Sequence, residues 1–191
     1  MGLLQWIKRL FVRAPQSPPG VPQPPLGASP FPPGTGPSRL IVMRHAEKSG
    51  DKRDPHLSLP GRRRAEQLVA YIPATFGQPE FLIAARTSKR SRRPLETLEP
   101  LAAALALEIR AKIYDDDVDE LIEMLRDKPR YFGKVGVISW RHSELPGLVA
   151  ALGGAPDSYP RSWDENDYTT IIEVTYPGNG EVHARRLKMS F

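Results

Sequence analysis

Apolar residues follow two alternating periods from residue 39 to the end of the chain. Four short apolar runs have the length and composition of buried strands, at 39–43, 81–85, 108–113 and 134–139. Four segments have apolar residues at helical spacing, at 61–72, 94–106, 117–127 and 144–152. The alternation predicts βαβ units. We therefore expect an α/β fold, a three-layer sandwich in which helices flank a mostly parallel central sheet.

The last part of the chain has a different pattern. Residues 168–176 and 182–189 are strand-like segments on either side of Pro177-Gly178-Asn179-Gly180, a sequence typical of a tight turn. This pattern predicts a C-terminal antiparallel β-hairpin attached to the sheet or its edge.

The chain divides into three parts. Ten of its 21 prolines lie between Pro15 and Pro37, mixed with Gly, Ser and Gln, which predicts a disordered, proline-rich linker over 14–38. Before it, residues 1–13 have apolar side chains on one side of a helical wheel and basic ones on the other, as in a short amphipathic helix. Residues 39–191 form the predicted domain.

The N-terminal segment is too short to cross a bilayer and lacks the basic region that precedes the apolar part of a signal peptide. Two interpretations of residues 3–13 remain: weak docking on a membrane surface or on a partner protein, or a terminus without a specific role. The second is favoured. We expect a cytoplasmic protein, with peripheral attachment to a membrane as the alternative that this segment leaves open.

Composition excludes several classes of site. The chain has no cysteine, so disulfide scaffolds, thiolate zinc sites and a cysteine nucleophile are excluded. The net charge is +5, but residues 1–38 contain three bases and no acid, which leaves 24 bases against 22 acids in the predicted domain. This near balance gives no argument for nucleic-acid binding.

Chemically active side chains follow three of the predicted strands. The first strand ends on Arg44-His45, and the fourth is followed by Arg141-His142. After the second, five bases lie between Arg86 and Arg93, just before a helix whose N-terminus also favours anions. No aromatic residues alternate with these bases, so phosphate binding is favoured over nucleic acid. Because parallel strands end at one edge of a sheet, these residues are expected to share one site.

These motifs, in this order, resemble the histidine phosphatase superfamily, also called phosphoglycerate mutase-like, and within it the small single-domain phosphatases. The Arg-His-Gly signature of that family appears as Arg44-His45-Ala46, with alanine in place of glycine. The Leu-Ser-x-x-Gly-x-x-x-Ala helix start spans 57–65 and the Arg-x-x-x-Thr pair is Arg93 with Thr97. The late strand-end histidine is His142. The Ser-Pro-Leu usual before the arginine is replaced by Ser88-Lys89-Arg90.

The resemblance implies a phosphatase that forms a phosphohistidine at His45. Arg44, Arg93 and His142 would surround the transferring oxygens and stabilise their charge in the transition state. Because these groups supply the positive charge, no metal and no other cofactor is expected. Asp115 to Asp117 are interpreted as a solvated acidic helix start rather than a metal site.

The proton for the leaving group has two candidate donors. Asp115 follows the third strand, where many relatives place the acid, and is slightly preferred; Glu144 lies two residues after His142. Either could instead only cap the helix that follows. Without an acid, phosphohistidine or aryl phosphates would be better substrates than alkyl esters.

The expected activity is hydrolysis of a phosphomonoester or phosphoramidate, on a small phosphorylated substrate or a phosphoprotein. Exposed bases are expected at the rim of the pocket: Lys48, Lys89, Arg90 and Arg141. Two alternatives stay open. One is a phosphomutase, for which the domain has little room for the usual insertions, and the other is a noncatalytic phospholigand-binding module tethered by the N-terminal segment.

Overall fold

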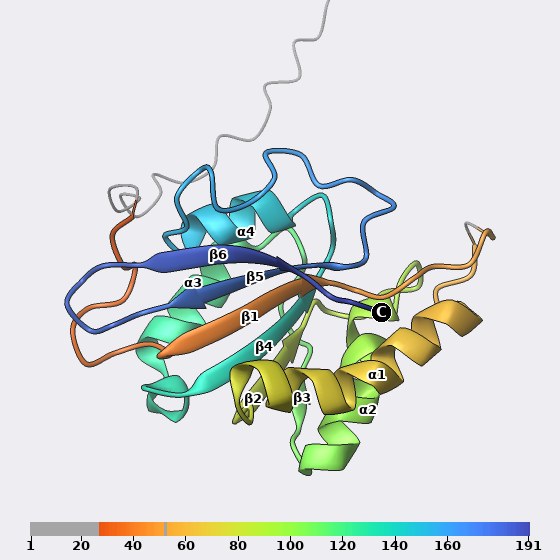
Figure 1. Cartoon of the computed structure of the whole chain (residues 1–191), viewed down its shortest axis with the longest axis horizontal. Coiled ribbons are helices and arrows are strands. Elements are labelled where there is room, and N and C mark those ends of the chain that lie inside the picture. Colours follow the sequence, from red (N-terminus) through yellow and green to blue (C-terminus); the bar gives the residue numbers. More distant parts are fainter. Residues whose placement is uncertain (1–26, 52) are drawn as a thin grey trace, which may run out of the picture.

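The structure of the protein, a computed structural model, describes residues 27–51 and 53–191 (Figure 1). The helix predicted over 1–13 and the linker as far as residue 26 lie outside the described residues. The elements, in chain order, are β1 (Arg39–Arg44), α1 (Leu59–Phe76), β2 (Phe81–Ala84), α2 (Arg93–Leu105), β3 (Ile109–Arg110), α3 (Val118–Asp127), the 3-10 helix η1 (Pro129–Tyr131), β4 (Val135–Trp140), α4 (Leu145–Ala151), β5 (Thr170–Thr175) and β6 (His183–Lys188).

One six-stranded sheet with the order β3-β2-β4-β1-β5-β6 forms the centre of the domain. The pairs β1–β4, β2–β4 and β2–β3 are parallel, whereas β5 is antiparallel to β1 and β6 is antiparallel to β5. Figure 1 shows α1 and α2 on one side of the sheet and α3 and α4 on the other. The predicted three-layer α/β sandwich with a mostly parallel sheet and a C-terminal hairpin is confirmed.

The strand directions decide which loops meet. The carboxyl ends of β1, β2 and β4 lie at one edge of the sheet because these strands are parallel. Since β5 runs the opposite way, its amino end lies at that same edge, with Ile171 opposite Met43. Residues that follow the parallel strands and residues that precede β5 are therefore brought together.

Apolar side chains of β1 pack into the core on both faces of the sheet. Leu40 and Val42 pack in the cluster that contains Leu148 of α4, whereas Ile41 and Met43 pack in the cluster that contains Leu68 of α1. Because successive side chains of a strand point to opposite faces, a continuous apolar run of this kind is typical of a strand that is covered on both sides. This explains why the 39–43 run was a clear strand signal.

Two predicted elements differ in length from the observed ones. The run at 108–113 contributes only the two-residue strand β3, which pairs with β2 at the edge of the sheet. An edge strand has one partner, and residues 111–113 leave the ladder although Ile113 is buried. Helix α1 continues beyond the predicted residue 72 to Phe76, with Pro73 inside the helix.

The described end of the proline-rich segment contacts the domain. The Ser29 backbone N–H donates to the Gly180 carbonyl at 2.9 Å, and the Phe31 ring packs edge-on against Tyr176 with 5.0 Å between ring centroids. Phe31 is only 5% exposed. Residues 27–38 thus cover the end of the sheet that is opposite to the carboxyl ends of β1 and β4. Within the described part of the chain, no helix has the length and apolarity needed to span a bilayer.

Candidate functional site

His45 is the first residue after β1 and continues its pairing with β4. Its backbone N–H donates to the Trp140 carbonyl at 3.0 Å, and its side chain is buried, with 5% exposure. The Nδ1 atom lies 2.7 Å from the Ala46 carbonyl oxygen. Because a carbonyl can only accept, this contact requires the proton on Nδ1. Nε2 then carries the free electron pair that a nucleophile needs.

Burial holds the His45 imidazole in its neutral form. It is the largest cause of a lowered pKa, and the positive charges of Arg44, Arg93 and His142 add to it. The hydrogen bond to the Ala46 carbonyl opposes these effects, and the resulting pKa is about 3. A neutral, oriented imidazole surrounded by cationic groups suits attack on an anionic phosphorus centre.

Arg93 comes from the start of α2. Its Nη1 donates to the Asp54 carbonyl at 3.0 Å and its Nη2 to the Arg90 carbonyl at 3.3 Å. The buried Thr97 hydroxyl donates to the Arg93 carbonyl at 2.7 Å and accepts from the Ala46 N–H at 2.9 Å. The first turn of α2 is thereby fastened directly to the residue after His45. Burial lowers the pKa of Arg93.

His142 follows β4 by two residues and faces the same group of charges. Its pKa is lowered first by burial and then by Arg44, Arg141 and Lys48, while Glu165 raises it. Arg44 pairs with Trp140 on adjacent parallel strands, and the Ala46–Thr97 hydrogen bond joins the start of α2 to them. The predicted residues Arg44, His45, Arg93 and His142 therefore lie in one neighbourhood.

Arg44 is 2% exposed, and its guanidinium group faces a segment that the sequence analysis did not assign to the site. Nη1 donates to the carbonyl oxygens of Glu165 and, at 3.4 Å, Asp164. Nη2 donates to the Tyr168 hydroxyl at 3.3 Å, and the guanidinium carbon lies 3.9 Å from the centre of the Tyr168 ring. The segment 163–168 thus provides hydrogen-bond acceptors for the two terminal nitrogens of Arg44 but none for its Nε.

Four buried side-chain atoms have no hydrogen-bond partner among the described residues. Three of them are Arg44 Nε, Arg93 Nε and His142 Nδ1; the fourth is Ser139 Oγ. A buried polar atom without a partner is costly, and such atoms are uncommon in folded proteins. Two guanidinium nitrogens and one imidazole nitrogen of this kind around a neutral histidine form an arrangement suited to an oxyanion.

The two candidate acids have other partners. The Asp115 carboxylate accepts from Arg141 Nη1 at 3.3 Å, and its backbone carbonyl accepts from Trp140 Nε1 at 2.9 Å. The Glu144 carboxylate accepts from the Ser143 hydroxyl at 2.8 Å, and Glu144 directly precedes α4. Among the described residues, neither carboxylate has a hydrogen bond to His45 or His142. The assignment of the acid stays a prediction.

Of the four predicted rim cations, two form ion pairs with acidic side chains and two are exposed in a loop. Lys48 forms an ion pair with Glu165 at 3.3 Å, and Arg141 forms one with Asp115. Lys89 and Arg90 are exposed in the loop between β2 and α2, and the Arg90 carbonyl accepts from Arg93. Lys89 and Arg90 therefore place exposed positive charge next to Arg93.

The loop after His45 is fixed by α1. The Glu47 carbonyl accepts from the Ser58 N–H at 2.9 Å, and its carboxylate accepts three hydrogen bonds from the Arg64 guanidinium at 2.7–3.0 Å. Gly61 approaches so closely that a Cβ atom there would lie 2.4 Å from the Glu47 carbonyl oxygen. This contact explains the glycine of the helix-start motif. In the arginine run, Arg62 and Arg63 are exposed and Arg64 is the structural one.

Sequence reasoning missed Tyr168 and the two carbonyls at 164 and 165. Within that stretch the sequence analysis assigned no site residue, because Tyr168 was the first residue of a predicted strand and the acidic residues before it matched no motif. Trp163 is 4% exposed in the core, and its Nε1 donates to the Asp167 carbonyl at 3.2 Å. The available signal was the antiparallel direction of the hairpin, which brings the residues before β5 to the site.

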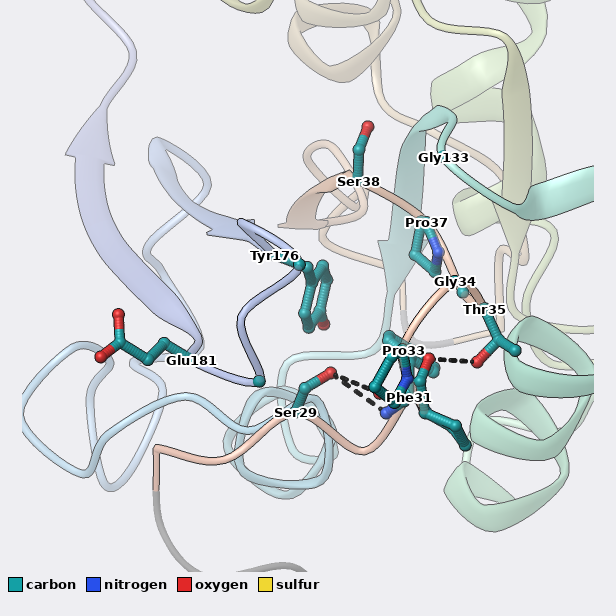
Figure 2. A pocket seen from close by; sticks show the side chains of 14 residues that line it. Ser29, Phe31, Pro33, Gly34, Thr35, Pro37, Ser38, Gly133, Tyr176 and Glu181 are labelled. Atoms are coloured by element: carbon teal, nitrogen blue, oxygen red, sulfur yellow. Dashed lines mark hydrogen bonds between the residues drawn. The ribbon is translucent and has the colours of Figure 1, made fainter.

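Two surface cavities lie away from these residues. One, of about 200 Å³, lies at the opposite edge of the sheet, between the 29–38 segment, Tyr176 and the β5–β6 turn (Figure 2). Figure 2 shows the hydroxyl groups of Ser29 and Thr35 bonded within that segment, and no lysine or arginine lines the cavity. The other, of about 530 Å³, lies between α1 and α2 and has His56 and Glu96 in its lining. Neither includes His45 or His142.

Comparison with solved structures identifies the fold. The protein histidine phosphatase SixA in complex with tungstate is similar over 78% of this chain and 96% of its own, with a TM-score of 0.55 and 18% identity. A mycobacterial glucosyl-3-phosphoglycerate phosphatase with inorganic phosphate is similar over 81% of this chain and 97% of its own, with a TM-score of 0.56 and 13% identity. A phosphoglycerate mutase from Plasmodium falciparum is similar over 78% and 89%, with a TM-score of 0.51 and 13% identity.

These likenesses show that the chain has the fold of the histidine phosphatase, or phosphoglycerate mutase-like, superfamily, which the sequence resemblance implied. No protein-family model matches the sequence, and no curated protein matches it either.

Proposed function

We propose that the protein is a metal-independent phosphatase that hydrolyses a phosphomonoester or phosphoramidate through a phosphohistidine at His45. The observation that carries the proposal is the set of three buried, unpartnered nitrogens around the neutral His45 imidazole: Arg44 Nε, Arg93 Nε and His142 Nδ1. A bound phosphoryl group would give each of them a hydrogen-bond partner.

The proposed reaction has two steps at one phosphorus atom. In the first, His45 Nε2 attacks in line, an N–P bond forms, and the bond to the leaving group breaks with its electron pair. In the second, water attacks the phosphohistidine, the N–P bond breaks, and inorganic phosphate leaves. Arg44, Arg93 and His142 stabilise the charge on the phosphoryl oxygens in both transition states. The fixed positive charge of the two guanidinium groups is the reason that no metal is needed.

The leaving group needs a proton in the first step. Asp115, the preferred donor, is ion-paired with Arg141, and protonating its carboxylate would give up that pair. Glu144 is the second candidate. With this arrangement, leaving groups that depart without a strong acid are expected to react fastest, so phosphohistidine and aryl phosphates should be preferred over alkyl phosphates.

The test is phosphate release from para-nitrophenyl phosphate, a phosphohistidine peptide, sugar phosphates and phosphoglycerates, with and without a chelator. The wild-type protein should release phosphate equally in both conditions, and His45→Ala should abolish release. His183→Ala is the matched control, because His183 is exposed at the start of β6, opposite Thr175 and away from the site. It should retain full activity.

Four results would contradict the proposal. Undiminished release by His45→Ala would exclude His45 as the nucleophile, and loss of release with the chelator would exclude metal independence. Binding of phosphate without release from any substrate would favour the phospholigand-binding module. Transfer of the phosphoryl group to a second position of a phosphoglycerate would instead indicate a mutase.

A further inference from the structure

Tyr168 reaches the site from the antiparallel part of the sheet. It lies two residues before β5, and the amino end of β5 is at the edge where β1 delivers Arg44 and His45. Its side chain is partly buried, and its ring centroid is 6.4 Å from that of His45. The sequence analysis gave this residue only a place in the hairpin.

The Tyr168 side chain contacts Arg44 in two ways. Its ring stacks on the guanidinium group, with the guanidinium carbon 3.9 Å from the ring centre. Its hydroxyl oxygen accepts from Arg44 Nη2 at 3.3 Å. The stacking and the hydrogen bond together fix the plane of the guanidinium, and with it the direction of Arg44 Nε.

Tyr168 also interacts electrostatically with the second arginine, Arg93. Tyr168 is among the groups that raise the pKa of both Arg44 and Arg93, against the larger lowering that burial causes in each. The oxygen is therefore within electrostatic reach of both guanidinium groups. An oxyanion held by Arg44 Nε and Arg93 Nε would lie in the same neighbourhood.

A tyrosine hydroxyl can accept and donate at the same time. Because the Tyr168 oxygen already accepts the Arg44 N–H, its own proton is available for another acceptor. The two surrounding guanidinium groups make an anionic acceptor the favoured one, and the hydrogen bond to it would be charge-assisted.

We propose that Tyr168 is a further phosphoryl-binding residue, whose hydroxyl donates a hydrogen bond to a nonbridging oxygen of the phosphoryl group while its ring holds Arg44 in place. This inference rests on the proposed function and deepens it. In this role the hydroxyl binds the phosphoryl group and transfers no proton to the leaving group, so its contribution is the same for every leaving group. The ligand class is a tetrahedral or trigonal-bipyramidal oxyanion.

The deciding variant is Tyr168→Phe, which removes the hydroxyl and retains the stacking ring. Tyr114→Phe is the matched control. Tyr114 is 52% exposed, and its ring stacks on Arg86, with the guanidinium carbon 4.5 Å from the ring centre. Calorimetry with inorganic phosphate and with orthovanadate measures oxyanion binding in the full chain without any turnover. Phosphate release from para-nitrophenyl phosphate and from an alkyl phosphate measures the reaction.

Tyr168→Phe is expected to weaken oxyanion binding roughly 10- to 100-fold, the usual effect of losing a hydrogen bond to a charged group. The kcat/KM values for both substrates should fall by one common factor, and Tyr114→Phe should match the wild type in every measurement. An oxyanion affinity equal to the wild type would overturn the assignment. A loss confined to the alkyl phosphate would also overturn it, because the hydroxyl would then serve the leaving group.

The two proposals fail differently. If the wild-type protein binds orthovanadate and releases no phosphate, the catalytic proposal is wrong, and the affinity of Tyr168→Phe still decides the role of Tyr168. If the wild type turns over substrates and Tyr168→Phe keeps its activity and affinity, only the role of Tyr168 is wrong.

Discussion

Two regions of the sheet build the candidate site, and they contribute in different ways. The parallel strands β1 and β4 and the helix after β2 supply the side chains with unpartnered nitrogens and the neutral His45. The segment 163–168, before antiparallel β5, supplies backbone carbonyls and an aromatic ring that enclose Arg44. In the proposed function, the first region supplies the nucleophile and the nitrogens that bind the phosphoryl group, and the second orients Arg44 and adds the Tyr168 hydroxyl. Arg44 is the side chain that joins them.

The largest effect is expected where the two regions meet. Arg44→Leu should reduce kcat/KM by about 10³-fold, as losses of oxyanion-stabilising groups do. It should also lower the free energy of unfolding by roughly 1–3 kcal/mol, because it leaves the Glu165 carbonyl without its donor and removes the stacking on Tyr168. Kinetics and urea denaturation measure the two effects.

Arg93→Leu is the comparison variant. It should lose similar activity with a smaller change in unfolding, because one of its two carbonyl partners, that of Arg90, lies at an exposed position. Equal destabilisation by the two substitutions would contradict the special role of Arg44 as the joint between the regions.

Gly61→Ala should damage the first region without touching any residue that faces the ligand. The added Cβ would lie 2.4 Å from the Glu47 carbonyl oxygen, so the loop after His45 must shift. Overpacking of this kind costs roughly 1–3 kcal/mol of unfolding free energy. The activity should fall as well, because Ala46 holds the His45 ring. Gly147→Ala, where a Cβ meets no atom within 4 Å, is the control for thermal unfolding and kinetics.

Acid should destabilise the first region through His45. The folded-state pKa of about 3 lies below the ordinary value of 6.5, so between these pH values the unfolded chain binds a proton that the folded chain does not. The free energy of unfolding should therefore fall as the pH falls through this window, by up to about 1.4 kcal/mol per pH unit. Urea denaturation of wild type and His45→Asn should give a shallower pH slope for the variant. Parallel slopes would show that His45 titrates normally in the fold.

The smallest effect is expected from the ion pair at the rim between the two regions. Lys48 and Glu165 are 40% and 64% exposed, and exposed pairs contribute little. Glu165→Ala should change the unfolding free energy by less than about 1 kcal/mol and kcat/KM by only a few-fold, because the carbonyl that binds Arg44 remains. A loss as large as that of Arg44→Leu would show that the carboxylate itself takes part in the reaction.

The two regions also differ in how far the sequence predicted them. A strand buried on both faces is a continuous apolar run, so the ends of β1 and β4 were clear, and Arg44, His45 and His142 followed from them. The length of β3 was overpredicted. An apolar run does not show how many of its residues will pair with a neighbouring strand when the run lies at the edge of the sheet. Helix α1 was underpredicted at its C-terminal end, where Pro73 lies inside the helix.

The role of Tyr168 depends on strand order and direction, which no local pattern contains. The predicted hairpin could pair in several ways with the sheet, and only the antiparallel pairing of β5 with β1 places Tyr168 beside Arg44. The same limit applies to the acid. Asp115 and Glu144 both follow elements at the correct edge, and their partners Arg141 and Ser143 became known only from the structure.

The most direct test of the account is to map the phosphoryl group on protein quenched with alkali within the first turnover. Mass spectrometry of the digested wild-type protein should locate an alkali-stable, acid-labile phosphoryl group on His45 that disappears with time, whereas the His45→Ala protein should carry none. A phosphoryl group on His142, or rapid turnover without any protein-bound phosphate, would contradict the assignment of His45 as the nucleophile.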